Sequence, residues 1–133
     1  MARFVPSRSL LVAFFCSVAV TALAAPIDDA TAAYEGGDFV TALRLLRPLA
    51  QAGDPLAQVD LGRMYDRGVG VAPDDAESAV WFRKAALQGY AIGQFNLGLA
   101  YHKGRGVALD YVQAARWTEL AAVQGYAVRI CGP

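Results

Sequence analysis

The chain has 133 residues, 56% of them hydrophobic, and its 12 basic residues balance 12 acidic ones. The basic residues form no run, so the electrostatic pattern of a nucleic-acid-binding protein is missing. The length suffices for one domain with a modest hydrophobic core.

The first 24 residues have the features of a secretory signal peptide. Two arginines precede an apolar run over residues 10–23, and Ala22-Leu23-Ala24 gives the run the small-x-small ending of a cleavage site. The run is shorter than the roughly 20 residues that a membrane-spanning helix needs. We therefore expect a signal peptide over 1–24 and a periplasmic or secreted protein of a Gram-negative bacterium. An uncleaved inner-membrane anchor is the alternative.

Cleavage would leave Cys131 as the only cysteine of the mature chain. Cys16 lies inside the apolar run, and bulky residues precede it where lipid attachment would require small ones. A single thiol cannot form an internal disulfide, so the mature fold must be stable without one in an oxidising compartment. The mature chain would carry 10 basic and 12 acidic residues, a net charge of −2.

The mature sequence, residues 25–133, is organised as a repeat with a period of 36 residues. Residues 55–90 align with residues 91–126 without a gap and share 16 identical positions, where unrelated stretches would share about two or three. The identical pairs are Gln58/Gln94, Leu61/Leu97, Gly62/Gly98, Tyr65/Tyr101, Gly68/Gly104, Gly70/Gly106, Val71/Val107, Ala72/Ala108, Asp74/Asp110, Ala79/Ala115, Trp81/Trp117, Ala85/Ala121, Ala86/Ala122, Gln88/Gln124, Gly89/Gly125 and Tyr90/Tyr126. A degenerate first unit covers 27–54, and a truncated last unit covers 127–133.

The first half of each unit has the pattern of a helix. Leu61 and Tyr65 are spaced by four residues, and a glycine-rich segment that begins at Gly68 ends the helix. Gly62 lies inside this helix, where glycine costs about 1 kcal/mol relative to alanine, and Gly98 repeats it one period later. A repeated penalty at one position predicts that another helix packs there too closely for a side chain.

The second half of the unit begins at Asp74, which is expected to cap a second helix. Glu77 follows three residues later and completes a capping-box pattern, and Asp110 and Gln113 repeat this spacing. The sequence therefore predicts an all-α fold. We expect an α/α superhelix (solenoid) of helix–turn–helix repeats, with about five helices after the signal peptide.

The positions that recur with the period define the expected structural core of the repeat. We expect their large side chains to pack inside the solenoid and their glycines to form turns or close contacts. These positions are Leu61, Gly62, Tyr65, Gly68, Gly70, Trp81, Ala85, Leu97, Gly98, Tyr101, Gly104, Gly106, Trp117 and Ala121.

Two strings of residues resemble the Sel-one-like repeat family, a relative of the tetratricopeptide repeat. They are Leu61-Gly62-x-x-Tyr65-x-x-Gly68-x-Gly70-Val71-x-x-Asp74 and Ala79-x-Trp81-x-x-x-Ala85-Ala86-x-Gln88-Gly89. The resemblance covers residues 34–127 and implies a helical superhelix. It also implies a function as an adaptor or scaffold that binds other proteins, and exported bacterial members of the family often assist envelope processes or meet host proteins.

The sequence offers no candidate catalytic, cofactor-binding or metal-ligating group. Ser78 is the only serine of the mature chain, and it lies inside an expected second helix without an adjacent base, so we expect it on the helix surface. His102 is the only histidine and has no neighbours at metal-ligand spacing. The two Gly-x-Gly loops follow helices rather than strands, so we interpret them as turns and not as phosphate-binding loops.

A non-catalytic protein-interaction module is therefore the expected function. The alternative is an envelope hydrolase or a penicillin-interacting protein, because some exported relatives rich in paired cysteines are associated with penicillin binding or weak β-lactamase activity. This chain lacks those cysteine pairs and a candidate nucleophile. We expect no cofactor, no nucleic acid partner and no permanent membrane span if the signal is cleaved.

The side of each first helix opposite the expected core is predicted to bind the protein or peptide partner. In tetratricopeptide relatives the first helices line a concave groove, and a mixture of polar and apolar groups is typical of a peptide-binding surface. The candidate residues are Asp60, Arg63, Met64, Asn96, Leu99 and Ala100. An ordinary solvated face is the alternative for each single residue.

The end of the last unit is expected to be incompletely covered. Stacked repeats need a polar cap at each end, and only residues 127–133 follow the second full unit. We expect exposed apolar surface beside Trp117 and Ala121. This surface would drive self-association or mark a truncated, unstable product.

Overall fold

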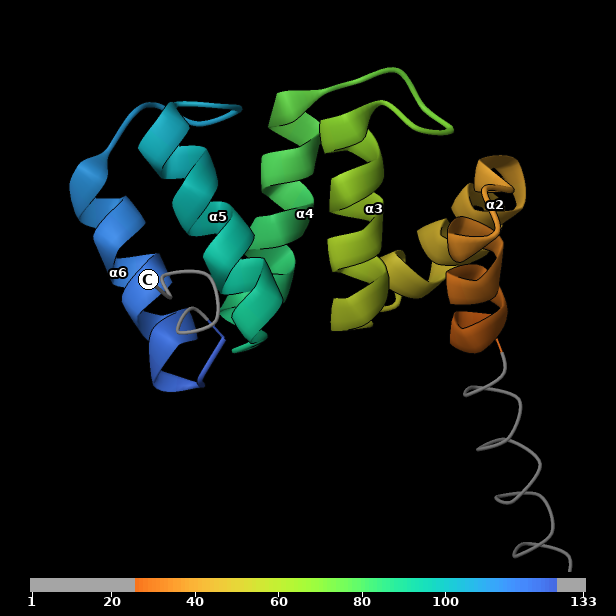
Figure 1. The fold of residues 1–133 in the computed structure, drawn as a ribbon, viewed down its shortest axis with the longest axis horizontal. Helices are drawn as coiled ribbons and strands as arrows, with labels where there is room; N and C mark the ends of the chain where they lie inside the picture. The colour runs from red at the N-terminus through yellow and green to blue at the C-terminus, as the bar shows by residue number, and fades with distance from the viewer. Residues whose placement is uncertain (1–25, 127–133) are drawn as a thin grey trace, which may run out of the picture.

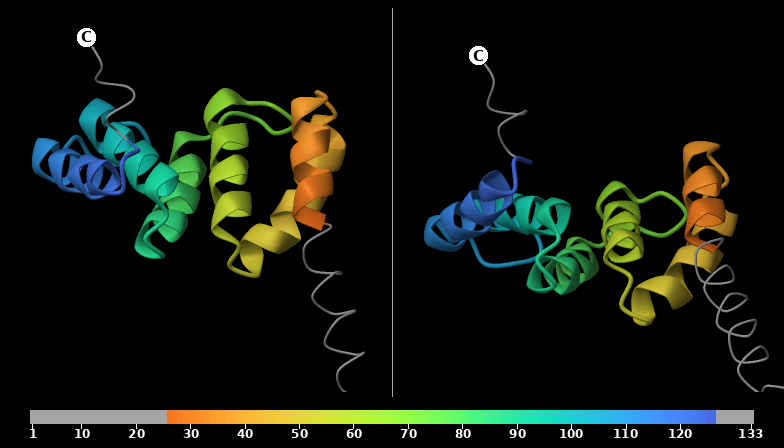
Figure 2. Two further views of the ribbon diagram at one scale, coloured as in Figure 1. Left: turned by 60° about the horizontal axis from the view of Figure 1, so that its bottom comes forward. Right: turned by 90° about the horizontal axis from the view of Figure 1, so that it is seen from below.

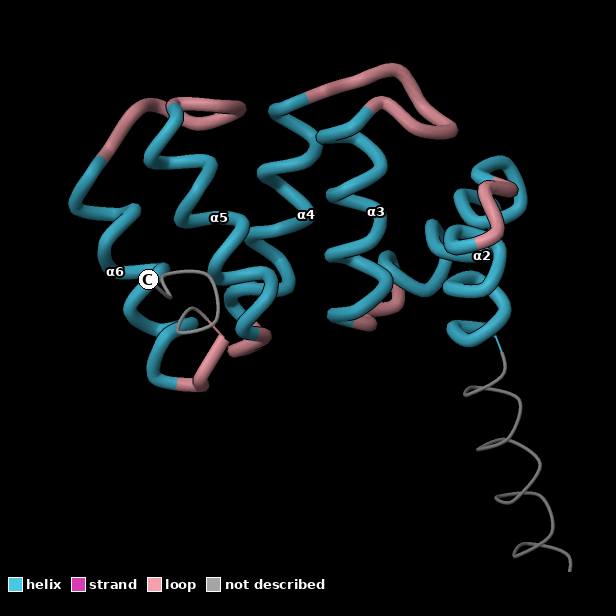
Figure 3. The backbone as a smooth tube through the Cα atoms, viewed as in Figure 1, coloured by secondary structure: helices cyan, strands magenta, loops and turns pink. Residues whose placement is uncertain are grey.

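The computed structural model describes residues 26–126, and this range contains helices and no strands (Figures 1 and 3). Residues 26–35 are helical. The helices that follow are α2 (Phe39–Gln51), α3 (Pro55–Arg67), α4 (Asp75–Leu87), α5 (Ala91–Lys103) and α6 (Tyr111–Val123). The predicted all-α fold is confirmed, with one helical segment more than expected over the described range. The predicted signal peptide, the truncated last unit, Cys16 and Cys131 lie outside the described residues.

Consecutive helices lie side by side along the molecule (Figures 1 and 2). α2 packs on α3, α3 on α4, α4 on α5 and α5 on α6. The first helices of the two full units, α3 and α5, also touch. The middle helices therefore bury one side against their predecessor and another against their successor, as in a repeat solenoid.

Aspartate side chains cap the N-termini of α3, α4 and α6. The carboxylates of Asp54, Asp74 and Asp110 each accept a hydrogen bond from the backbone N–H three residues later, at 2.9, 3.1 and 3.0 Å. The capping box expected at Asp74 does not form, because the backbone N–H of Asp74 donates to the carbonyl oxygen of Tyr65 at 3.0 Å instead of to the Glu77 side chain. The equivalent pair one period later makes the same bond at 3.1 Å.

Glycine ends the first helix of each full unit. Gly68 follows α3 with a φ of 67°, and Gly104 follows α5 with a φ of 63°. This left-handed conformation is open to glycine without a Cβ penalty. The N–H of each glycine donates to the carbonyl oxygen four residues earlier, on Met64 and Ala100 respectively.

The loop inside each full unit also contacts the preceding unit. Gly70 and Gly106 lie in these loops, each against the backbone at the start of the preceding second helix. A Cβ on Gly70 would lie 2.9 Å from the carbonyl oxygen of Phe39, and a Cβ on Gly106 would overlap the carbonyl group of Asp75. The loop therefore joins its own unit to the one before it.

Gly62 and Gly98 let the two helices of a unit approach each other closely. A Cβ on Gly62 would lie 2.8 Å from the ring of Phe82, and a Cβ on Gly98 would lie 2.6 Å from the methyl group of Thr118. Gly98 also faces backbone, because its Cβ would lie 3.2 Å from the carbonyl oxygen of Ala114. Each repeated glycine thus lies where a neighbouring helix leaves no room for a side chain.

Glutamine side chains connect adjacent units. Nε2 of Gln58 donates to the carbonyl oxygen of Ala50 at 3.1 Å. Nε2 of Gln88 donates to the carbonyl oxygen of Gly53 and to Oε1 of Gln58, both at 2.9 Å. The same set of bonds recurs one period later.

The core consists of two clusters of buried apolar side chains. The first joins residues 26–35, α2, α3 and α4, and it contains Leu61, Met64 and Trp81. The second joins α3, α4 and α5, and it contains Phe82 and Leu97. The two clusters follow one another along the solenoid, so the interior has no single centre.

The positions expected in the repeat core divide into buried, half-buried and exposed sets. The fully buried ones include Leu61, Ala85, Leu97 and Ala121. The half-buried aromatic ones are Tyr65, Tyr101 and Trp117. The exposed ones are Gly70, Gly104 and Gly106, which belong to the loops and not to the packed interior.

Candidate functional site

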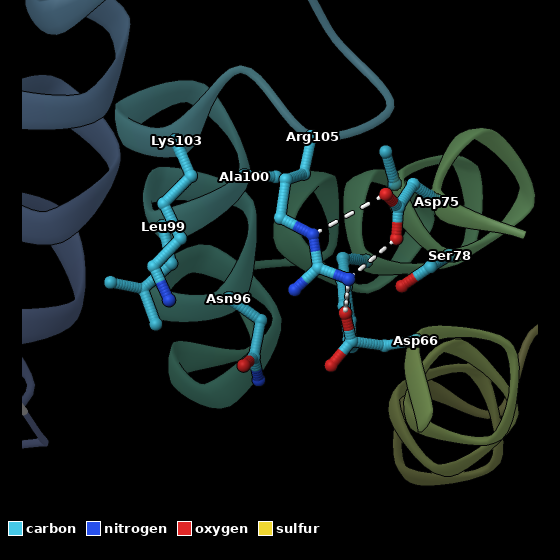
Figure 4. A pocket seen from close by; sticks show the side chains of 10 residues that line it. Asp66, Asp75, Ser78, Asn96, Leu99, Ala100, Lys103 and Arg105 are labelled. Atoms are coloured by element: carbon cyan, nitrogen blue, oxygen red, sulfur yellow. Dashed lines mark hydrogen bonds and ion pairs between the residues drawn. The ribbon is translucent and has the colours of Figure 1, made fainter. Parts of the chain in front are cut away.

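A small cavity, which we call the α3–α5 hollow, lies between α3, α4 and α5 (Figure 4). Its volume is about 70 Å³, whereas small-molecule pockets usually have roughly 300–1,000 Å³. Its lining comes from the three helices and from the loop after α5. The lining residues are Asp66, Asp75, Ser78, Ala79, Phe82, Asn96, Leu99, Ala100, Lys103 and Arg105.

Arg105 bridges the two acidic side chains of the hollow (Figure 4). Its Nη2 lies 2.7 Å from Oδ1 of Asp75, and its Nε donates to Oδ2 of the same carboxylate at 3.3 Å. Nη2 also lies 3.2 Å from Oδ1 of Asp66. The guanidinium group therefore connects the loop after α5 to α4 and α3 at once.

The bridge holds a charged guanidinium group at the edge of the hollow. The hydrogen bond to Asp75 and the negative charge of Asp66 raise the pKa of Arg105 above its usual value. All three side chains are close to half-exposed, and exposed ion pairs contribute little to stability. We therefore infer that the bridge positions the loop after α5 and the polar groups around the hollow.

Three of the predicted partner-binding residues line the hollow. Asn96, Leu99 and Ala100 lie on α5 and are half-buried. Nδ2 of Asn96 donates to the carbonyl oxygen of Ile92 at 2.8 Å, so the helix backbone fixes its amide group. The hollow thus offers apolar contact at Leu99 next to polar groups from α3 and α4.

The other three predicted residues do not line the hollow. The expectation that Met64 lies on a free face is wrong, because its side chain is fully buried in the first apolar cluster. That side of α3 is covered by α2 and by the loop that contains Gly70, close to the end of the Met64 side chain. Asp60 is also buried, at 6% exposure, and only Arg63 remains partly exposed.

Asp60 carries a carboxyl group in a mostly buried position. Burial raises its pKa, and the nearby Arg63, whose Nη1 lies 3.4 Å from Oδ1, partly offsets this effect. Burial together with the charge of Asp60 also raises the pKa of Tyr90. This acidic group therefore lies inside the fold next to α5 and is hardly accessible to a partner.

Ser78 lies on the wall of the hollow and is buried, at 3% exposure. The expectation of a surface serine is wrong, because α4 turns this side toward α3 and α5. Within the described residues, no hydrogen bond joins its hydroxyl group to a histidine, a lysine or a carboxylate. The environment therefore shows no activating base of the kind that a nucleophilic serine uses.

His102 is exposed, and its ring lies edge-on to that of Tyr111, with 5.4 Å between the ring centroids. Over residues 26–126, no three His, Cys, Asp or Glu side chains are grouped so that they could hold a metal ion. Over the same range, no helix has the length and hydropathy needed to cross a bilayer.

The 36-residue period does not predict the polar part of the hollow. Arg105 stands where Val69 stands one period earlier, so within residues 26–126 the bridge has no equivalent in the preceding unit. Asp66 and Asp75 likewise align with His102 and Tyr111. Twenty of the 36 aligned positions differ between the two units, so no sequence signal sets these three residues apart.

The comparisons with known proteins identify the family. The family model of the Sel1 repeat matches residues 55–90 and 91–126, which together cover more than half of the chain. The chain is a Sel1 repeat protein. The matched ranges have the same bounds as the two units of the 36-residue period. Proteins with Sel1 repeats generally mediate protein–protein interactions.

Two solved structures are similar to this Sel1 repeat protein. A Sel1 repeat protein from Oxalobacter formigenes is 36% identical, with a TM-score of 0.71, and the match covers 74% of this chain and 41% of that one. The antigen c5321 of uropathogenic Escherichia coli, described as a protective antigen with an SLR fold, is 48% identical, with a TM-score of 0.64, and the match covers 65% of this chain and 18% of that one. This chain therefore corresponds to less than half of either protein. No curated protein matched it.

Proposed function

We propose that this Sel1 repeat protein is a non-catalytic module of the bacterial cell envelope that binds a partner protein at the α3–α5 hollow. The observation that carries the proposal is the convergence of side chains from three stacked helices on one small polar hollow. Interaction through such a composite surface agrees with the general role of Sel1 repeats. The surface exists only when neighbouring units are stacked.

The size and chemistry of the hollow favour a polypeptide ligand. A cavity of about 70 Å³ accepts the end of one side chain but not an organic substrate of ordinary size. Leu99 supplies apolar contact, while Lys103 and the Arg105 bridge supply charged groups at the rim. A segment of a partner protein that presents one anchoring side chain and flanking polar groups would match this arrangement.

Export is part of the proposal and rests on the sequence. The arginines, the apolar run and the Ala22-Leu23-Ala24 ending of the first 24 residues support transport and cleavage. Mass spectrometry of the protein recovered from the periplasm of cells that express the full chain tests this. A mature chain that begins at Ala25 is the expected result, and an intact N-terminus in the membrane fraction would favour the anchor instead.

The partner-binding surface can be tested by site-specific photocrosslinking. A photoreactive amino acid replaces Lys103, which is exposed at the rim of the hollow, or Leu87, which is 71% exposed on α4 outside it. We expect a discrete crosslinked protein from position 103 and none of the same mass from position 87. Leu99→Asp, which places a charge on the wall of the hollow, should abolish that crosslink.

Equal crosslinking from both positions would contradict the proposed surface, as would a crosslink that survives Leu99→Asp. Circular dichroism of the Leu99→Asp protein should match that of the original chain. A discrete product from position 87 alone would move the binding surface to the other side of α4.

A further inference from the structure

The outward face of α6 carries a stripe of exposed side chains. Val112, Arg116, Glu119 and Val123 are spaced by four, three and four residues, so they lie along one side of the helix. Val112 is 69% and Val123 is 81% exposed, and the two charged residues between them are also exposed. The fully buried Ala121 lies on the opposite side of α6. We call these four residues the α6 stripe.

The stacking of helices along the solenoid does not cover this side of a second helix. One period earlier, the equivalent positions on α4 are Ala76, Val80, Arg83 and Leu87. All four are exposed, although α5 packs directly on α4. A further unit stacked on α6 in the same way would therefore leave the α6 stripe open to solvent.

The order of residues in the α6 stripe is self-complementary. When two copies of α6 run antiparallel about a twofold axis, each Val112 faces the partner's Val123, and each Arg116 faces the partner's Glu119. Two Val–Val contacts then flank two Arg–Glu ion pairs. Within the described residues, neither Arg116 nor Glu119 forms an ion pair, so both are available for this contact.

The same pairing is unfavourable at α2, the other second helix with two charges at these positions. Two periods before Arg116 and Glu119 stand Arg44 and Arg47, both exposed. Two copies of α2 in the same antiparallel arrangement would place arginine opposite arginine, which is repulsive. The charge pattern therefore distinguishes α6 from the equivalent face of α2.

We propose that the α6 stripe is the interface of an antiparallel homodimer of this chain. The contact is isologous, because the same four residues of both copies form it. It differs from the self-association expected from the sequence, which placed the apolar surface beside Trp117 and Ala121. It is also separate from the α3–α5 hollow, to which α6 contributes no lining residue.

The dimer is expected to be weak. A single pair of helices buries less than the roughly 1,200–2,000 Å² of a standard protein interface. We therefore expect a dissociation constant on the order of tens of micromolar, which rises with salt concentration because exposed charges are screened.

The experiment is sedimentation equilibrium of the protein purified from cells that express the full chain, over about 10 µM to 1 mM. Glu119→Arg and Arg116→Glu each place like charges across the axis and should raise the dissociation constant at least about tenfold. An equimolar mixture of the two variants should recover the original association, because every pair across the axis is then attractive. The double variant Arg116→Glu/Glu119→Arg should also dimerise like the original chain.

The matched control is Arg44→Glu, which makes the same charge change at the equivalent position of α2. It should leave the dissociation constant within about twofold of the original value. A monomer at about 1 mM would overturn the proposal. An equal effect of Arg44→Glu and Arg116→Glu, or a mixture of variants that stays monomeric, would overturn it as well. Circular dichroism establishes that every variant keeps its helix content.

Discussion

The side-chain amide of Gln88 donates a hydrogen bond to the side-chain oxygen of Gln58, 30 residues earlier, at 2.9 Å. The donor group of Gln58 is thereby directed at the carbonyl oxygen of Ala50 in the preceding helix. Gln88 reaches the same unit boundary at Gly53. Two polar side chains thus satisfy one another and two backbone acceptors where consecutive units meet.

Gln58→Ala should therefore lower the free energy of unfolding. The substitution removes a buried donor and leaves the carbonyl group of Ala50 and the amide of Gln88 without this partner. A loss of about 1–3 kcal/mol is expected, measured by urea unfolding followed by circular dichroism. Gln51→Ala, which changes an exposed glutamine, should stay within about 0.5 kcal/mol of the original chain. Equal stability of the two variants would contradict this role of Gln58.

Gly98→Ala should destabilise the protein more than Gly62→Ala does. A Cβ at position 98 meets the methyl group of Thr118 and fixed backbone atoms of α6, whereas the three atoms nearest to a Cβ at position 62 all belong to the ring of Phe82, a side chain that can shift more easily than backbone. Overpacking lowers the free energy of unfolding by about 1–3 kcal/mol, and we expect the larger decrease at position 98. Thr118→Ser, combined with Gly98→Ala, should recover part of the loss in thermal unfolding. The reverse order of the two glycine variants would contradict the close approach of α6.

Trp81→Ala should lower the free energy of unfolding by about 3–5 kcal/mol. Trp81 is 8% exposed and belongs to the first apolar cluster, so its removal leaves a large cavity. Trp117→Ala is the matched control one period later and should cost clearly less, because Trp117 is only half-buried. A loss below about 1 kcal/mol at Trp81 would mean that the indole ring does not pack as described.

Asp60→Asn should stabilise the protein at neutral pH. Burial raises the pKa of Asp60, so the folded state binds this proton more tightly than the unfolded state does. The contribution of Asp60 is therefore most favourable below its unfolded pKa and is lost as the pH rises through the folded pKa. The stability gained by Asp60→Asn should grow between about pH 4 and pH 7 in urea unfolding. Asp29→Asn, the same exchange at an exposed position, is the matched control.

Ser78→Ala should not change the hydrolysis of a chromogenic β-lactam by the purified protein. Ser78 is buried on the wall of the hollow, and no base is bonded to its hydroxyl group in the described part of the chain. We expect the original chain to show only the rate of buffer. A measurable rate that disappears in Ser78→Ala would establish the hydrolase alternative.

The repeat made most of the fold predictable from the sequence. Leu61 and Leu97 are spaced by one period and are both fully buried, because equivalent positions of stacked units meet equivalent neighbours. Met64 was misplaced because the helix and loop that cover it come partly from the first unit, where the period is degenerate. The role of Arg105 could not be predicted from the period, because its bridge depends on residues that differ between the two units.

The contact of each glycine loop with the preceding second helix has a consequence for folding cooperativity. Gly70 meets Phe39 and Gly106 meets Asp75, so a loop reaches its final conformation only when the previous unit is already in place. An isolated unit would lose this contact with the preceding unit as well as its apolar neighbour. The units should therefore melt together in one transition.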